Sequence, residues 1–164
     1  MPKFYHIHRS PKPSSIEKKL IKNFKLYYSK KNSFWYNVEQ DIGKTDYGGY
    51  IIYEIEIPKL QFTTSFNPIK KNKIVKLTPK NIQEYIKILT EVAKKKYNFI
   101  EEMNNRNIIG IDATAKFIRE KNEEYSFIEI SEGLIGITSD EGFIWKFPRT
   151  IKIKKIKVYD NSKQ

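Results

Sequence analysis

Acidic residues gather at expected turns late in the chain. Within residues 125–147, three short apolar runs are separated by residues 132–133 (Glu-Gly) and 140–142 (Asp-Glu-Gly). Such pairs are common in solvated hairpin turns, which is the simplest interpretation. Carboxylates crowded at one sheet edge, however, raise one another's pKa and can hold or orient a substrate hydroxyl. We therefore take three residues as candidate catalytic acids: Asp140, Glu141 and Glu132.

The charges of the chain are separated by sign. Residues 120–142 carry seven acids against one lysine, whereas residues 1–36 carry eight lysines and one arginine against Glu17. The formal net charge of +12 predicts attraction to nucleic acid, acidic protein or another polyanion. Almost all basic residues are lysines, and bidentate arginine contacts are the usual means of reading guanine. Base-specific reading of DNA is therefore disfavoured relative to diffuse electrostatic binding.

His6 and His8 lie two residues apart in an alternating segment, so a strand would direct both to one face. Arg9 and Ser10 follow directly, and together these side chains could bind ribose hydroxyls and a pyrophosphate. The alternative is that one histidine packs in the core and the other lies in solvent. Two histidines with no nearby carboxylate, in a chain without cysteine, predict no metal site.

A second candidate ligand surface is aromatic. Tyr28 and Ser29 end an expected strand, and Trp35 follows within the group 34–36. An aromatic face beside a hydroxyl can stack on a planar ring such as nicotinamide, although aromatic clusters more often serve packing. The hydroxyls of residues 63–65 (Thr-Thr-Ser) could also bind a ligand, but this tripeptide is typical of ordinary turns.

Periodicity predicts the elements that would position these residues. Expected strands cover residues 3–8, 25–29, 50–57 and 150–158, with three more forming a meander over 125–147. Expected helices begin after Ser14-Ser15, at Thr78-Pro79 (to about Tyr97), and at Asp112 (through Ile118). Residues 34–49, aromatic at one end and glycine at the other, are expected to include a loop that shapes acceptor choice. The lysine-rich strand 150–158 would protect an exposed sheet edge.

These elements predict an α+β protein with a split mixed or antiparallel sheet and two to four helices, because strands outnumber helices and the late strands are hairpin-linked. At 164 residues we expect one globular domain over 1–164, with about 159–164 as a short polar tail. The N-terminus lacks the apolar run of a signal peptide, which favours a cytoplasmic protein. The surplus of Lys, Ile, Asn and Tyr is typical of an AT-rich gene, as in a virus or phage.

The order of several short motifs resembles the ADP-ribosyltransferase superfamily, most closely small phage-encoded members of anti-CRISPR type. The motifs are His8-Arg9-Ser10-Pro11, Leu26-Tyr27-Tyr28-Ser29, the strand around Tyr53, and residues 113–117 leading to 136–142 (GITSDEG). The resemblance implies a split mixed sheet that binds NAD in a cleft. It also implies transfer of ADP-ribose to a protein or nucleic acid of a host or rival, in the host cytoplasm if the protein is viral.

The resemblance also implies roles for individual residues. His8 or His6, with Arg9 and Ser10, would bind ribose and phosphate, and Tyr28 and Ser29 would bind nicotinamide, with Trp35 as a further aromatic contact. Asp140 or Glu141 would be the catalytic acid, with Glu132 in reserve. Under the arginine-type variant of the family, the catalytic set would instead be Arg9, Thr64 and Glu132.

Two non-enzymatic functions remain open. Lysine-rich strands with exposed Tyr and Trp could hold single-stranded nucleic acid by charge and stacking, which requires that the aromatic rings be exposed. Alternatively, the chain could be an inhibitor or structural viral protein without activity.

Overall fold

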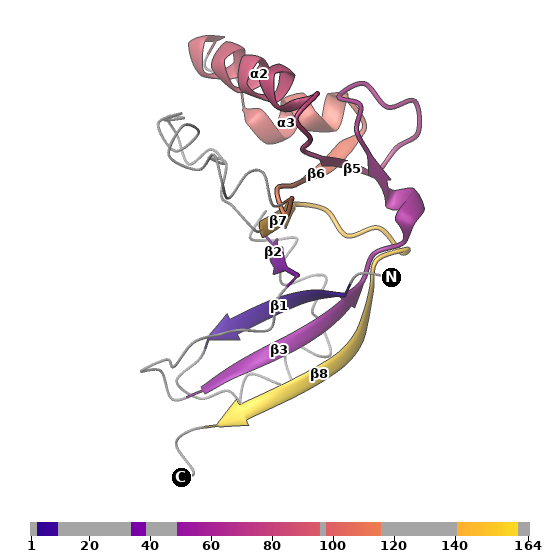
Figure 1. Ribbon diagram of the computed structural model, residues 1–164, viewed down its shortest axis with the longest axis vertical. Coiled ribbons are helices and arrows are strands. Elements are labelled where there is room, and N and C mark those ends of the chain that lie inside the picture. The colour runs from indigo at the N-terminus through magenta and orange to yellow at the C-terminus, as the bar shows by residue number, and fades with distance from the viewer. Residues whose placement is uncertain (1–2, 10–33, 39–48, 96–97, 116–140, 161–164) are drawn as a thin grey trace.

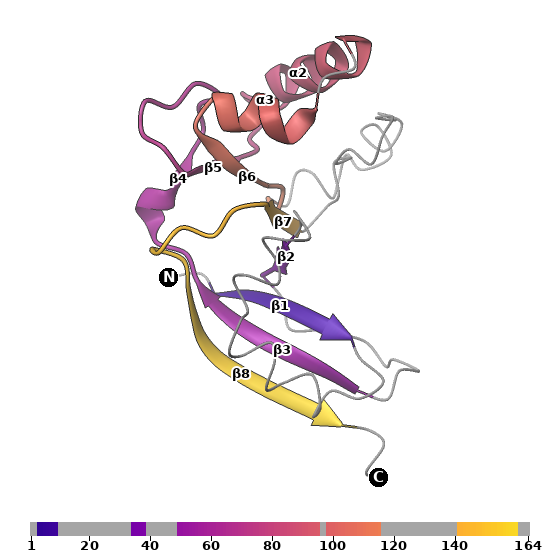
Figure 2. The same cartoon turned by 180° about the vertical axis from the view of Figure 1, so that it is seen from behind.

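The computed structural model describes residues 3–9, 34–38, 49–95, 98–115 and 141–160. Within these ranges the strands form one curled sheet in the order β4-β5-β6-β7-β2-β1-β3-β8, with two α-helices at one end of the molecule (Figures 1 and 2). The strands are β1 (Phe4–Arg9), β2 (Phe34–Asn37), β3 (Gly49–Glu56), β4 (Phe62–Thr63), β5 (Lys73–Lys76), β6 (Ile108–Asp112), β7 (Glu141–Ile144) and β8 (Lys152–Asp160). The helices are the short 3-10 turn η1 (Lys59–Gln61), α2 (Ile82–Lys95) and α3 (Phe99–Asn105).

The sheet is mixed. The pairs β4–β5 and β5–β6 are parallel, and every other described pair is antiparallel. The chain connects β5 to its parallel neighbour β6 through α2 and α3, as a parallel pair requires. The mixed sheet and the helices agree with the predicted α+β class. A mixed sheet was among the predictions, but the strands β4, β5 and β6, which form its parallel part, were not predicted.

The sheet narrows sharply between β1 and β2. These two strands pair at a single position, Tyr5 with Asn37, whereas β1 pairs with β3 along its full length. The His6 side chain links the two strands beyond this pair: its Nδ1 donates to the carbonyl of Trp35 at 2.5 Å. The sheet therefore has two parts, β1-β3-β8 and β4-β5-β6-β7-β2, joined at a short contact.

The outer part of the sheet matches the sequence prediction closely. β1, β3 and β8 correspond to the expected strands 3–8, 50–57 and 150–158, and β8 is the edge strand among those that the structure describes. β8 extends through Asp160, so the predicted polar tail begins later than residue 159. On β3, Glu54 and Glu56 form ion pairs with Lys3 (3.5 Å) and Lys154 (2.7 Å). These ion pairs neutralise part of the lysine charge within the sheet.

The helices match less well. α2 begins at Ile82, a few residues after the predicted start, but the turn before it is capped as predicted. The Thr78 hydroxyl accepts from the amide of Asn81 (3.2 Å), the Asn81 side chain accepts from the amide of Thr78 (2.7 Å), and the amide of Ile82 donates to the Thr78 carbonyl. α3 was not predicted; the side chain of Asn98 caps it by accepting from the amides of Ile100 and Glu101. The helix expected to begin at Asp112 is wrong over residues 112–115, because Asp112 ends β6.

Two apolar clusters cover the opposite faces of the sheet. The cluster on the helix side combines residues of α2 and α3, such as Leu89 and Met103, with Phe143 and Trp145. The Trp145 indole Nε1 donates to Asn104 on α3 at 2.9 Å. The second cluster includes Phe34, Tyr36, Tyr53, Ile74 and Ile144.

The segment 34–49 departs from the predicted loop at both ends. Residues 34–37 form β2, in which Phe34 and Tyr36 are fully buried, and Gly49 begins β3. Residues 39–48 lie outside the described part of the chain, as do the expected helix after Ser15, the strand 25–29 and the meander up to residue 140. No helix among the described residues has the length and apolar character needed to span a membrane.

Candidate functional site

The strands β6, β7 and β2 lie side by side and determine which candidate residues share a face. Asp112 pairs with Gly142, which in turn pairs with Tyr36. At the next position along β7 and β2, Phe143 pairs with Trp35. Because successive residues of a strand point to opposite faces, Tyr36 and Asp112 lie on one face and Trp35 on the other.

On the first face, a tyrosine and an aspartate are hydrogen-bonded across three strands. The Tyr36 hydroxyl donates to Asp112 Oδ2 at 2.7 Å, passing over Gly142 of the strand between them. A Cβ atom on Gly142 would lie 1.9 Å from Cζ of the Tyr36 ring, so only glycine allows this approach. Glu141 and Gly142 thus belong to β7, and the prediction that they form a turn is wrong.

The Asp112 carboxyl group is 2% exposed and is held from both sides. Its Oδ1 accepts from the amide (3.0 Å) and the hydroxyl (2.5 Å) of Thr114, and its Oδ2 accepts from Tyr36. Burial of the Tyr36 ring, and then the nearby Asp112, raise the pKa of Tyr36 well above its usual value. The phenol therefore stays protonated and acts as a fixed hydrogen-bond donor.

The opposite face carries two of the predicted site residues. Trp35 is half-buried and packs against Phe143, with ring centroids 4.5 Å apart. Glu141, also half-buried, lies two residues from Phe143 on β7 and pairs in register with Asn37. The amide of Ala113 donates to the Glu141 carbonyl at 2.9 Å, which extends the β6–β7 ladder past Asp112. Trp35, Asn37 and Glu141 therefore share one face at one end of the β2–β7 pair.

The His6 side chain is buried and packs among aromatic rings. Its ring is 8% exposed, stacks on Phe34 at 4.3 Å, and contacts Tyr53 at 5.8 Å. With its Nδ1 bonded to Trp35, the imidazole packs between β1 and β2, as the alternative of a core histidine predicted. These contacts favour a structural role for His6.

The other predicted residues are placed only in part. His8 and Arg9 continue β1 opposite Ile51 and Tyr50. Ser10, Tyr28, Ser29, Glu132 and Asp140 lie outside the described residues.

The hydroxyls of Thr63 and Ser65 make local turn contacts, which agrees with the interpretation of residues 63–65 as an ordinary turn. Ser65 donates its amide to the Thr63 hydroxyl (3.2 Å), and Asn67 donates its amide to the Ser65 hydroxyl (3.0 Å). These are local turn contacts of the kind that Ser and Thr commonly make. Thr64 is exposed, and its carbonyl accepts from the Asn81 side chain at 3.0 Å.

Sequence reasoning missed Asp112 and Tyr36 as a pair. The aspartate was interpreted as the start of a helix, although the preceding Ile108-Ile109-Gly110-Ile111 is the short continuous apolar run of a strand buried on both faces. Among the described residues, no group of three or more His, Asp or Glu side chains could hold a metal ion. No family model matches the chain, and neither the curated proteins nor the solved structures contain a match.

Proposed function

We propose that the protein transfers ADP-ribose from NAD, with Trp35 and Glu141 at the reacting end of the ligand. The observation that carries this proposal is the juxtaposition of a half-buried indole and a half-buried carboxylate on one face of β2 and β7. The two residues were selected from the sequence for stacking on nicotinamide and for acid chemistry. The register of two strands far apart in the sequence puts both residues on one face of the β2–β7 pair, which supports the proposal.

The reaction places specific demands on such a face. The bond between ribose C1′ and the nicotinamide nitrogen breaks, and nicotinamide leaves with the bonding electron pair as a neutral ring. An acceptor nucleophile forms the new bond at C1′ and releases its proton to solvent. Positive charge develops on the ribose as the bond breaks, and a preorganised carboxylate stabilises it. In this proposal Glu141 supplies that carboxylate and Trp35 stacks on nicotinamide.

The Tyr36–Asp112 hydrogen bond supports the same end of the sheet from the other face. It links β2 to β6 across β7, and so fixes the separation of the strands that carry Trp35 and Glu141. A site on strands is held more firmly when the strands themselves cannot slide. Tyr36 is thus a positioning residue in this proposal and does not touch the ligand.

The stacking mode of nucleic-acid binding receives less support. Among residues whose side chains the structure describes, the large apolar side chains that are exposed are Val38, Leu60 and Ile69, and none of these is aromatic. Base stacking needs accessible aromatic faces.

NAD binding can be read directly from tryptophan fluorescence. The chain has two tryptophans, and Trp145 is 5% exposed and hydrogen-bonded to Asn104, so a stacking ligand should quench Trp35. We expect saturable quenching by NAD in the wild type and in Trp145→Phe, and none in Trp35→Phe. Equal responses of Trp35→Phe and the wild type would contradict the assignment.

Catalysis is tested separately by nicotinamide release and by transfer of labelled ADP-ribose to protein or nucleic acid of a host lysate. We expect Glu141→Gln to bind NAD and to lose both activities, while Glu91→Gln, the same change on the exposed face of α2, retains them. Activity that survives Glu141→Gln would remove this residue from the mechanism.

A further inference from the structure

Two aliphatic side chains are largely exposed to solvent, one on η1 and one on the loop between β4 and β5. Leu60 is 84% exposed and Ile69 is 97% exposed. Each is adjacent in sequence to exposed lysines: Lys59 beside Leu60, and Lys70 and Lys71 after Ile69. Figures 1 and 2 both show η1 and this loop on the same side of the molecule. We call these five residues the Leu60–Ile69 surface.

The surrounding chain contains no acid. Between Glu56 and Glu84 there is no Asp or Glu, and all of these residues are described. The lysines in this interval are Lys59, Lys70, Lys71, Lys73, Lys76 and Lys80. By contrast, the lysines that contact Glu54 and Glu56 elsewhere in the sheet are paired with acids, whereas this interval supplies six lysines and no carboxylate of its own. Such a patch attracts an acidic partner and speeds its association.

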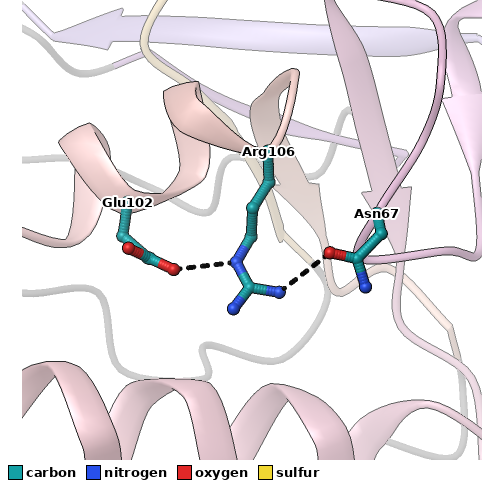
Figure 3. A network of polar contacts seen from close by, with 3 residues as sticks. All are labelled: Asn67, Glu102 and Arg106. Carbon is teal, nitrogen blue, oxygen red and sulfur yellow. Dashed lines mark hydrogen bonds and ion pairs between the residues drawn. The ribbon is translucent and has the colours of Figure 1, made fainter.

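The loop that carries Ile69 is held in place by side chains of the α3–β6 connection. Arg106 joins Glu102 of α3 (2.9 Å) to the Asn67 side chain (3.3 Å), as Figure 3 shows. Asn107, at a positive φ of 66°, donates its side-chain amide to the carbonyl of Pro68 at 3.0 Å. Ile69 is therefore exposed on a loop whose backbone is held by hydrogen bonds from neighbouring elements. Preorganisation of this kind lowers the entropic cost of binding.

The buried side chain of Gln61 links η1 to the end of the loop between β4 and β5. Its Nε2 donates to the carbonyl of Asn72, and its Oε1 accepts from the Thr150 hydroxyl. Lys73 adds a second link from its Nζ to the Leu60 carbonyl. These contacts fix η1 against the end of the loop, with the exposed Arg149 next to Thr150.

We propose that the Leu60–Ile69 surface docks an acidic protein segment that carries apolar side chains. This goes beyond the proposed enzymatic function and does not depend on it. A protein interface combines apolar and polar side chains, and the exposed Leu60 and Ile69 with their sequence-adjacent lysines supply both kinds. Nucleic acid fits less well, because aliphatic side chains neither stack on bases nor bind phosphate. Exposed aliphatic side chains in solvent gain free energy only from an apolar partner.

The test uses fluorescence anisotropy of the full chain with two labelled probes. One is a short peptide in which glutamates alternate with leucines, and the other is an oligothymidylate of matched charge. Leu60→Ser with Ile69→Ser should weaken peptide binding about tenfold or more, because two apolar side chains no longer pack against the leucines. It should change oligothymidylate binding less than about twofold, since the charge is unchanged. Both side chains are exposed, so the fold is not at risk.

A matched pair of charge reversals locates the binding. Lys70→Glu with Lys71→Glu should abolish most of the peptide affinity, whereas Lys94→Glu with Lys95→Glu, at the exposed end of α2, changes the net charge equally and should retain it. Equal losses for the two pairs would overturn the proposal. So would unchanged peptide binding by the double serine variant, tighter binding of oligothymidylate than of peptide, or no peptide binding at low salt.

Discussion

Replacing Gly142 by alanine tests the close approach on which the centre of the sheet depends. The new Cβ would lie 1.9 to 2.4 Å from three atoms of the Tyr36 ring, far inside normal contact, and the ring cannot yield without leaving Asp112. Overpacking of a core costs about 1–3 kcal/mol. Loss of a hydrogen bond to a buried carboxylate costs about 1.5–3 kcal/mol more. We therefore expect Gly142→Ala to lower the free energy of unfolding by about 3–5 kcal/mol.

Urea unfolding followed by circular dichroism measures this loss. For a chain of this size a loss of about 3–5 kcal/mol corresponds to a fall of roughly 10 °C in Tm. The decisive control is the same substitution in a Tyr36→Ala background, where no ring opposes the new methyl group. There Gly142→Ala should cost less than about 0.5 kcal/mol, which gives a large coupling energy between the two positions. A small cost in the wild type, or an equal cost in both backgrounds, would refute the packing described here.

Two further predictions concern buried tyrosines. The pKa of Tyr36 is raised in the folded state, so its contribution to stability is complete below the ordinary tyrosine pKa of about 10 and declines at higher pH, where the unfolded state ionises more readily. The advantage of the wild type over Tyr36→Phe in urea unfolding should therefore shrink above about pH 10, and a pH-independent difference would contradict this. Tyr85→Phe should leave stability unchanged or raise it by about 1 kcal/mol, because the buried Tyr85 hydroxyl has no hydrogen-bond partner within the described structure. A loss of stability of about 1 kcal/mol in the same assay would show that the Tyr85 hydroxyl is hydrogen-bonded.

The sequence predicted the elements whose hydrophobic pattern has a clear period. The alternation of Tyr53, Ile55 and Ile57 identified β3, and the helical spacing of Tyr85 and Leu89 identified α2. β5 and β6 were missed because both are short and show no alternation. The two central residues of Lys73–Lys76 are both buried, and every residue of Ile108–Asp112 is buried.

The candidate site could be predicted only in part, because it depends on register. Trp35 and Glu141 were selected for their chemistry, but the pairing of Asn37 with Glu141 is a property of the folded sheet. The Tyr36–Asp112 hydrogen bond joins residues 76 positions apart, and nothing local in the sequence signals it. His6 illustrates the reverse: a motif that suggested ligand binding is used to join β1 to β2 where their backbones separate.

The central claim is that Trp35 and Glu141 form the reacting end of an NAD site. The most direct measurement is nicotinamide release from NAD by the purified wild type, Glu141→Gln and Glu91→Gln at equal concentration, with NAD binding followed by fluorescence in the same samples. The account predicts saturable quenching in all three proteins and nicotinamide release by the wild type and Glu91→Gln alone. No quenching and no release by the wild type, or release that persists in Glu141→Gln, would contradict it.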